Sequence, residues 1–153
     1  MVRKPTYAQY EISLKVVLKN KRGETLLMRA ISTGSMPWGF DLPGGRIMTN
    51  EFGSSIKRVL KRELAEELGS GVRYRLNEVP VALGRHSYRI KRSSKYQPVL
   101  WILFEGTYLG GTIQISPEHP YYAWRHLTKV NFKPLFERGA RDAMTHYFTH
   151  KLP

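Results

Sequence analysis

The sequence contains no cysteine, which excludes a disulfide framework and any metal site built from thiolates. It also has no apolar run approaching the roughly 20 residues needed to span a bilayer. The first residues, Met1 to Pro5, lack the apolar segment of a secretory signal. Together these absences predict a cytoplasmic protein that has no membrane partner.

Acidic residues are few relative to basic ones. Twelve Asp and Glu stand against 25 Lys and Arg, so the formal net charge is +13 at pH 7. A surplus of this size favours anionic partners such as nucleotides, nucleic acid or acidic surfaces. The alternative interpretation is that the charge serves solubility alone.

Several common catalytic motifs are missing as well. There is no Gly-x-x-x-x-Gly-Lys-Ser/Thr phosphate loop, no Gly-x-Ser-x-Gly elbow and no His-Glu-x-x-His motif. The five histidines are scattered and show no metal-ligand spacing. These absences argue against a P-loop nucleotidase, an α/β-hydrolase and a zinc protease.

Apolar side chains, by contrast, are plentiful. Of 153 residues, 41% are hydrophobic, and there are nine Tyr, six Phe and three Trp. A chain of this length can bury a substantial core but has no room for a second one. Residues 1–153 are therefore expected to form a single domain.

Hydrophobic patterning predicts a mixture of strands and helices. The strand-forming segments are 10–18, 24–30, 40–42, 72–76, 80–90, 99–109 and 112–115. The most apolar of them, 99–109, is expected to be central and covered on both faces. Helical spacing predicts one helix over 55–68 and another over 133–150. This combination indicates a mixed α/β domain.

The first of these helices carries a cluster of negative charge. Glu63, Glu66 and Glu67 are spaced i, i+3 and i+4, so all three project from one helical face. Like charges at these spacings repel by about a few tenths of a kcal/mol per pair. A divalent cation would make the cluster favourable, and Arg62 can relieve part of the repulsion.

The sequence around this cluster resembles the Nudix box. The family pattern is Gly, five residues, Glu, seven residues, Arg-Glu, an aliphatic, any residue, Glu-Glu, any residue, Gly, an aliphatic. The residues that carry the resemblance are Leu42-Pro43-Gly44-Gly45, then Glu51, then Arg62-Glu63-Leu64-Ala65-Glu66-Glu67-Leu68-Gly69. The aliphatic expected after Gly69 is displaced to Val72.

The spacing inside the box departs from the family pattern. Five residues separate Gly45 from Glu51, as expected, but ten separate Glu51 from Arg62 where the family has seven. Counting back from Arg62 places Ser54 at the first-glutamate position, with Ser55 as the N-cap of the helix. An enlarged loop is the favoured interpretation, because the glycine and serines before the helix are typical of a helix start. The role of Glu51 stays open.

The resemblance implies an α/β/α sandwich around a mixed sheet and a Mg²⁺-dependent pyrophosphohydrolase, in which Mn²⁺ could replace Mg²⁺. The metal would neutralise a pyrophosphate and activate an attacking water. Arg62 would orient the cluster by pairing with a carboxylate. The implied metal ligands are the backbone carbonyl of Gly44 and the side chains of Glu63, Glu66 and Glu67. A glutamate of the cluster, or Glu118, would take the proton of the water.

Other candidate site residues lie before and after the box. Arg29 falls where the family commonly has a basic residue facing substrate phosphate, and plain edge exposure is the alternative. Phe40 and Trp38 could stack on a base, although aromatics just before a Pro-Gly-Gly turn more often pack in the protein interior. Segment 116–124 resembles a downstream family segment in which Glu-His precedes an aromatic and a Trp. Within it, Glu118 is the first candidate for a ligand or base and His119 the second, and structural roles are the alternative.

Three functions remain open. The first is cleavage of the diphosphate linkage in a small nucleotide: a nucleoside triphosphate, a nucleotide sugar or a dinucleotide. The second is action on RNA 5′ ends, because five Lys or Arg lie between Arg85 and Lys95, interleaved with Tyr88 and Tyr96. The third is a non-catalytic nucleotide-binding module, which the altered box spacing would explain. The resemblance also makes a homodimer a candidate assembly.

Overall fold

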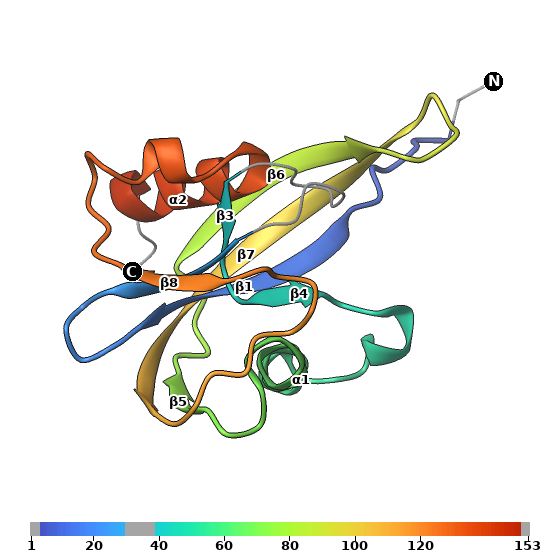
Figure 1. Ribbon diagram of the computed structural model, residues 1–153. Helices are drawn as coiled ribbons and strands as arrows, with labels where there is room; N and C mark the ends of the chain where they lie inside the picture. Colours follow the sequence, from blue (N-terminus) through green and yellow to red (C-terminus); the bar gives the residue numbers. More distant parts are fainter. Residues whose placement is uncertain (1–3, 30–38, 151–153) are drawn as a thin grey trace.

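The computed structural model describes residues 4–29 and 39–150. In that part of the chain, eight strands form one mixed sheet with a helix on each face (Figure 1). The strands are β1 (Glu11–Lys19), β2 (Thr25–Arg29), β3 (Phe40–Asp41), β4 (Gly44–Arg46), β5 (Arg73–Leu76), β6 (Ala82–Arg89), β7 (Tyr96–Gly110) and β8 (Tyr122–Arg125). The helices are α1 (Ile56–Leu68) and α2 (Arg138–His150), with 3₁₀ turns η1 (Thr49–Glu51) and η2 (Lys133–Leu135). The expected α/β/α sandwich is confirmed.

The parallel pair β1 and β7 forms the middle of the sheet. Its register runs from Glu11 opposite Val99 to Lys19 opposite Thr107. The strand order is β3-β2-β1-β7-β5, while β4 pairs with β1, β6 with β7 and β8 with β2. Because successive side chains of a strand point to opposite faces, β1 contributes side chains to two cores, one on each face of the sheet. The expectation that 99–109 is a central strand is confirmed.

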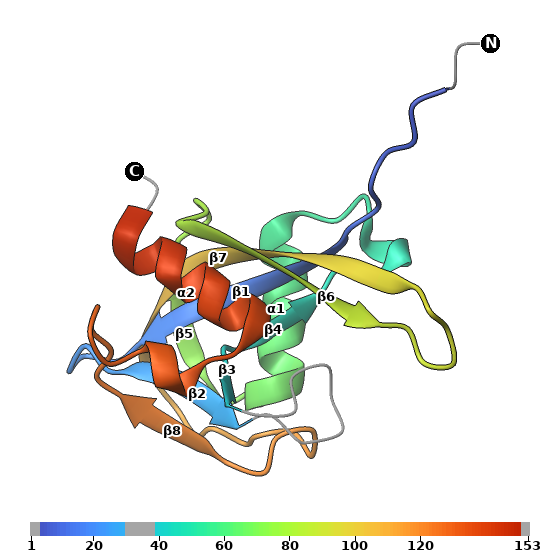
Figure 2. The same cartoon turned by 90° about the horizontal axis from the view of Figure 1, so that it is seen from above.

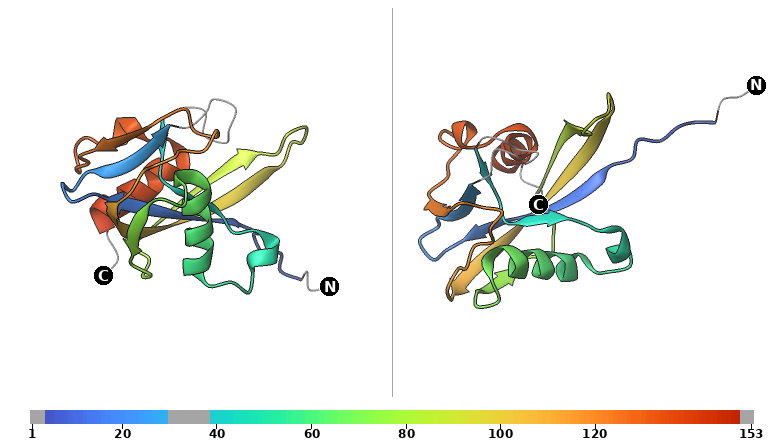
Figure 3. Two further views of the ribbon diagram at one scale, coloured as in Figure 1. Left: turned by 60° about the horizontal axis from the view of Figure 1, so that its bottom comes forward. Right: turned by 45° about the vertical axis from the view of Figure 1, so that its right-hand side comes forward.

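The two helices cover opposite faces of the sheet, as Figures 2 and 3 show. Leu14, Val16 and Leu18 of β1 pack in a core with α1, and Val17 packs in the core beneath α2. The hairpin of β6 and β7 extends away from the body of the molecule (Figure 1). None of the helices in the described residues is long and apolar enough to cross a membrane.

Helix α1 begins where the serine pair predicted. The side chain of Ser55 accepts a hydrogen bond from the Arg58 backbone N–H, which makes it the N-cap. The apolar stripe is buried from Val59 onward, whereas Ile56 is 37% exposed. Ile56 lies in the first turn, where the helix reaches beyond the edge of the core. Gly69 ends the helix with a positive φ of 85°.

Three sequence-based boundaries were wrong. Residues 112–115 form no strand, because the backbone N–H groups of Gln114 and Ser116 donate to the last carbonyls of α1. The expected helix over 133–150 is two pieces, separated at Phe136, whose backbone is extended and whose ring is fully buried. Residues 44–46, where no strand was predicted, form the short strand β4.

Candidate active site

The Pro-Gly-Gly segment connects the candidate site to the centre of the sheet by pairing with β1. The Pro43 carbonyl accepts the Val16 N–H, and Gly44 and Gly45 pair with β1. Gly44 has a φ of +121°, and a Cβ there would collide with the Leu14 carbonyl. A Cβ on Gly45 would lie 2.5 Å from the carboxylate of Glu63. Glycine is therefore required at Gly44, and at Gly45 the backbone lies directly against the carboxylate of a box glutamate.

Glu67 joins this turn to α1. Its Oε2 accepts the Gly44 N–H at 2.7 Å, and the residue is only 8% exposed. Its Oε1 lies 3.4 Å from Nε2 of His119. A buried carboxylate is tolerated only with such partners. The last glutamate of the box is thus held in one orientation by two segments far apart in the sequence.

His119 completes this contact from the loop before β8. Its Nδ1 lies 3.0 Å from the Arg29 carbonyl, which can only accept, so Nδ1 carries a proton and Nε2 faces Glu67. Burial alone would lower the pKa of His119, but hydrogen bonds to Glu67 and to the Arg29 carbonyl outweigh burial and raise it. The protonated ring then donates to Glu67. Glu118, ranked first from the sequence, is exposed and takes no part in this contact.

Arg62 gathers three acidic side chains. Its Nε lies 2.5 Å from Oε1 of Glu51, and one terminal nitrogen lies 2.9 Å from Oε2, so the pair is bidentate. The other contacts reach Glu63 at 2.8 Å and Glu66 at 3.0 Å. These contacts with carboxylates raise the pKa of Arg62. The hydrogen bond between Arg62 and Glu51 is also the largest cause of the lowered pKa of Glu51. The arginine pairs with carboxylates, as the sequence suggested.

Despite the longer spacing, the enlarged loop places the side chain of Glu51 in contact with Arg62. The extra residues are taken up around the turn η1, where Oε2 of Glu51 accepts the Met48 N–H at 2.9 Å. Ser54, the alternative at this position of the box, follows η1 and donates its backbone N–H to the Glu51 carbonyl. Of the two alternatives, Glu51 is therefore the one whose side chain contacts Arg62.

Glu63 and Glu66 differ in exposure. The side chain of Glu63 is 12% exposed and that of Glu66 is 58% exposed. Burial raises the pKa of Glu63, the hydrogen bond and charge of Arg62 oppose the rise, and Glu67 adds to it. An additional cation near Glu63 would therefore favour its ionised form.

The donor set fits a hard divalent cation. Carboxylate oxygens are the ligands that Mg²⁺ and Mn²⁺ take, and the three box glutamates supply them at the base of a glycine turn. Within residues 4–29 and 39–150, no three acidic or histidine side chains are already arranged as a metal site. The reason is visible in the contacts, because Arg62 now holds Glu63 and Glu66. The residues present are therefore of the type that binds a divalent cation, but their side chains are not already arranged around a common point.

Lys15 is a functional candidate that sequence reasoning missed. It lies on β1, 5% exposed, and its Nζ donates to Oδ2 of Asp41 at 2.9 Å. It also donates to the carbonyls of Leu42 at 3.1 Å and Gly44 at 2.6 Å. Burial would lower the pKa of Lys15, but the charges of Asp41 and Glu67 raise it overall. The available signal was a lysine in the middle of an apolar strand.

Arg29 and Phe40 face each other across β2 and β3. They are register partners, and the guanidinium carbon lies 5.7 Å from the ring centroid. Phe40 is 7% exposed, and its ring meets Tyr121 edge-on at 6.1 Å. This burial supports packing over stacking on a base. Trp38, the other aromatic candidate, lies outside the described residues.

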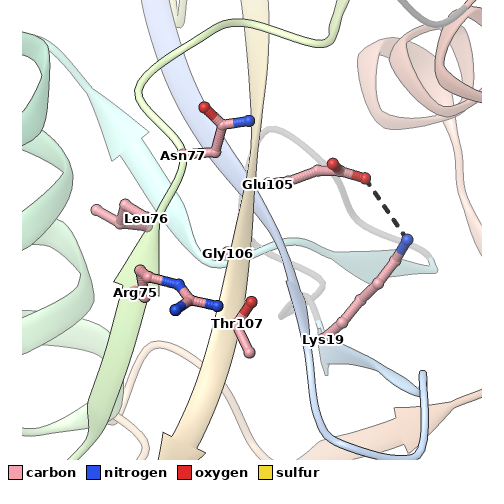
Figure 4. Close-up of a pocket in the computed structure, with 7 residues that line it drawn as sticks. All are labelled: Lys19, Arg75, Leu76, Asn77, Glu105, Gly106 and Thr107. Atoms are coloured by element: carbon pink, nitrogen blue, oxygen red, sulfur yellow. Dashed lines mark ion pairs between the residues drawn. The ribbon is translucent and has the colours of Figure 1, made fainter.

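A hollow lies away from the carboxylates, at the opposite end of β1. Figure 4 shows its seven lining residues, and its volume is about 490 Å³. Lys19 and Glu105 form an ion pair at 3.6 Å on one side of it. The lining residues are Lys19, Arg75, Leu76, Asn77, Glu105, Gly106 and Thr107. None belongs to the box, so this hollow is separate from the glutamate site.

Comparison with solved structures yields close matches to the fold. A MutT protein from Methanosarcina mazei Go1 matches with a TM-score of 0.62 and 27% identity, covering 94% of both chains. A NUDIX hydrolase from Nitrosomonas europaea matches with a TM-score of 0.61 and 14% identity, over 94% of this chain and 72% of that one. A MutT NUDIX hydrolase from Burkholderia pseudomallei matches with a TM-score of 0.54 and 18% identity, over 77% and 84%. No family model and no curated protein matches the sequence.

The fold, the glycine turn and the glutamates of α1 define an enzyme class, the hydrolases that act on acid anhydrides in phosphorus-containing substrates. Within that class, the chain is similar to the Nudix hydrolases in its fold. The resemblance seen in residues 42–69 is confirmed by the whole fold.

Proposed function

We propose that this Nudix hydrolase is a Mg²⁺-dependent pyrophosphohydrolase that cleaves the diphosphate linkage of a small nucleoside diphosphate derivative. The substrate class comprises nucleoside triphosphates, nucleotide sugars and dinucleotides. The observation that carries the proposal is the clamp on Glu67, in which Gly44 and His119 orient one buried carboxylate beside Glu63. A purely structural charge cluster has no need of a fixed, buried carboxylate next to a glycine turn.

The box glutamates would hold the cation in this proposal. Glu63, Glu66 and Glu67 supply the oxygens, and Arg62 releases Glu63 and Glu66 while keeping Glu51 as its bidentate partner. When bound, the ion would neutralise the diphosphate and lower the pKa of a water. The carbonyl of Gly44 was implied as a further ligand, but it already accepts a hydrogen bond from Lys15.

The chain's own residues position the reactants and the proton. Glu66 is the cluster member most open to water, so it is the first candidate to take the proton of the attacking water. Glu118, exposed beside His119, is the second. Arg29, at the end of β2 close to the His119 loop, is the candidate for binding substrate phosphate.

The test is a substrate panel with and without Mg²⁺. We expect phosphate or pyrophosphate release from one group of small nucleotides, dependent on the metal and abolished in Glu67→Gln. Mn²⁺ should support the reaction as well. A folded protein that turns over no member of the panel would instead be a non-catalytic binding module.

A second candidate substrate is a 5′-phosphorylated RNA. The supporting observation is the hairpin of β6 and β7, on which five basic side chains are exposed without an acidic neighbour in sequence: Arg85, Arg89, Lys91, Arg92 and Lys95. Arg46 of β4 connects this hairpin to the box, because its guanidinium carbon lies 4.9 Å from the Tyr88 ring centroid. Including 5′-triphosphorylated RNA in the panel separates the two candidates. Faster turnover of the RNA than of any small nucleotide would favour the second.

A further inference from the structure

The Lys15 ammonium has no hydrogen-bonding capacity to spare. An ammonium group has three protons, and three oxygens accept them: Oδ2 of Asp41 and the carbonyls of Leu42 and Gly44. The shortest of the three, at 2.6 Å, is the contact to Gly44. The group is buried, and the Trp101 ring centroid lies 5.1 Å away on the same face of the sheet. Lys15 is therefore fixed by the fold and charged in place.

This ammonium lies at the oxygen where a metal ion was expected. Mg²⁺ stands about 2.1 Å from its oxygen ligands, so an ion on the Gly44 carbonyl would come within about 5 Å of Nζ. Two cations at that separation repel, and the burial of Lys15 leaves little water to screen them. The side chain also cannot swing aside without removing the ion-pair partner of the partly buried Asp41 carboxylate.

We propose that the Lys15 ammonium replaces a divalent cation at the Gly44 carbonyl, so that this enzyme binds its metal through the glutamates of α1 and not through the glycine turn. This inference rests on the proposed function, because it concerns the same metal site. The lysine then limits the number of divalent ions that the site accepts, while Glu67 is oriented separately by its hydrogen bond from the Gly44 N–H.

A purely structural role for Lys15 makes a different prediction. A carbonyl oxygen has two lone pairs, so the Gly44 carbonyl could accept from Lys15 and still bind a metal ion. In that case removing the ammonium would loosen the turn and weaken metal binding. Under our proposal, removing it opens the carbonyl and strengthens metal binding. The two roles therefore predict changes of opposite sign.

The Gly44 carbonyl can be observed directly by NMR. The sequence has only two Gly-Gly pairs, Gly44-Gly45 and Gly110-Gly111. In protein labelled only at glycine with carbonyl ¹³C and amide ¹⁵N, an experiment that correlates each amide with the preceding carbonyl gives one signal for each pair. The second pair lies at the end of β7 and serves as an internal reference. The shift of the Gly44 carbonyl is followed while Mg²⁺ is added.

The variant for comparison is Lys15→Met with Asp41→Asn, which removes both charges of the buried pair at nearly constant volume. Lys19→Met is the matched control. Lys19 lies on the same face of β1 as Lys15, two residues beyond Val17, but it pairs with Glu105 and not with Asp41. We expect Mg²⁺ to move the Gly44 carbonyl signal several-fold further in the double variant than in the wild type or the control. Mn²⁺ binding, measured by the electron paramagnetic resonance of the free ion, should tighten at least ten-fold or gain a second ion.

An equal or larger shift in the wild type, or weaker Mn²⁺ binding in the double variant, would overturn the proposal. The wild-type titration decides the matter even if the double variant fails to fold, because coordination by Gly44 would show there as a shift well above that of Gly110. The proposed function fails in a separate way. In that case wild-type protein would bind no Mn²⁺ at all, and Glu67→Gln would change nothing.

Discussion

At the scale of single residues, the site is organised by carboxylates whose partners come from distant parts of the chain. Glu67 receives the Gly44 N–H from the glycine turn and faces His119 from the loop before β8. Glu51 receives Arg62 from α1. Each contact fixes an oxygen atom in the direction that metal ligation or charge pairing requires.

We expect Glu67→Gln to lower kcat by about 10²-fold or more, the scale of losing one well-oriented catalytic group. The amide keeps the volume of the side chain but removes the charge, and it offers only one oxygen to Gly44 and His119. The measurement is kcat on the preferred substrate, together with Mn²⁺ affinity. Glu78→Gln is the matched control, because Glu78 is an exposed glutamate paired only with Lys57 in the described contacts. Activity within ten-fold of the wild type would contradict the role of Glu67.

The Glu51 contact should appear in the pH dependence of stability. Hydrogen bonding to Arg62 and to the Met48 N–H lowers the pKa of Glu51 below its usual 4.5. A depressed pKa stabilises the fold at pH values above the unfolded pKa, and this contribution is lost as pH falls through the folded value. In urea unfolding we therefore expect the wild type to exceed Glu51→Gln in stability at pH 7, and the difference to shrink progressively as the pH falls below the usual pKa of 4.5 and through the lowered folded value. A difference that does not change with pH would rule this account out.

Sequence patterns predicted the box residues but not all of their partners. The glutamates and Arg62 were visible because their spacing places them on one helical face. Lys15 and His119 contact the site only through the folding of the sheet, and no local spacing encodes those contacts. His119 was ranked below Glu118 from the sequence. Both lie in the same loop, and only the structure shows that His119 is the buried one of the two.

At the scale of elements, α2 packs against β6 at two glycines that leave no room for a Cβ. A Cβ on Gly84 would collide with the Ala143 backbone nitrogen, and one on Gly139 would collide with the His86 ring. Two glycines, one from each element, therefore allow the helix to approach the strand. Burial lowers the pKa of His86 and keeps its ring neutral beneath the helix.

Gly84→Ala should destabilise the protein by about 1–3 kcal/mol, the usual cost of overpacking a core. The new methyl group must push α2 away from β6, because the obstacle is backbone and not a flexible side chain. Chemical denaturation measures the change. Gly53→Ala is the control, because a Cβ there would meet nothing within 4 Å and the residue needs no positive φ. Equal stabilities of the two variants would show that the helix adapts freely.

Element boundaries were predicted where the sequence carries local signals. The N-cap serine and the apolar stripe fixed α1, and alternation fixed β1. Segment 112–115 has strand-like composition, yet the N–H groups of Gln114 and of the following Ser116 donate to the last carbonyls of α1, a tertiary contact that composition does not show. Strand β4 is a glycine-rich segment that exists only because β1 pairs with it.

At the scale of the whole molecule, the net charge of +13 separates the two substrate candidates. A small nucleotide meets only the charges around the box. A single RNA strand that also follows the hairpin of β6 and β7 would neutralise several of its basic side chains. The surface charge therefore matters to the second substrate class and hardly to the first.

The salt dependence of RNA binding tests this difference. For a single strand, log affinity falls with log salt concentration by about 0.7 per phosphate neutralised. If the strand follows the hairpin, replacing Arg89, Lys91 and Arg92 by Gln should flatten the slope by about 2. The matched control replaces Lys21, Arg22 and Lys129 by Gln, which removes the same net charge from exposed positions elsewhere. The measurement is the affinity for 5′-triphosphorylated RNA between low and physiological salt, beside turnover of the best small nucleotide. A flatter slope in the hairpin variant alone, with small-nucleotide turnover unchanged, would identify the hairpin as an RNA-binding surface. The same change in both variants would attribute the RNA affinity to net charge, and the hairpin would then give no support to an RNA substrate.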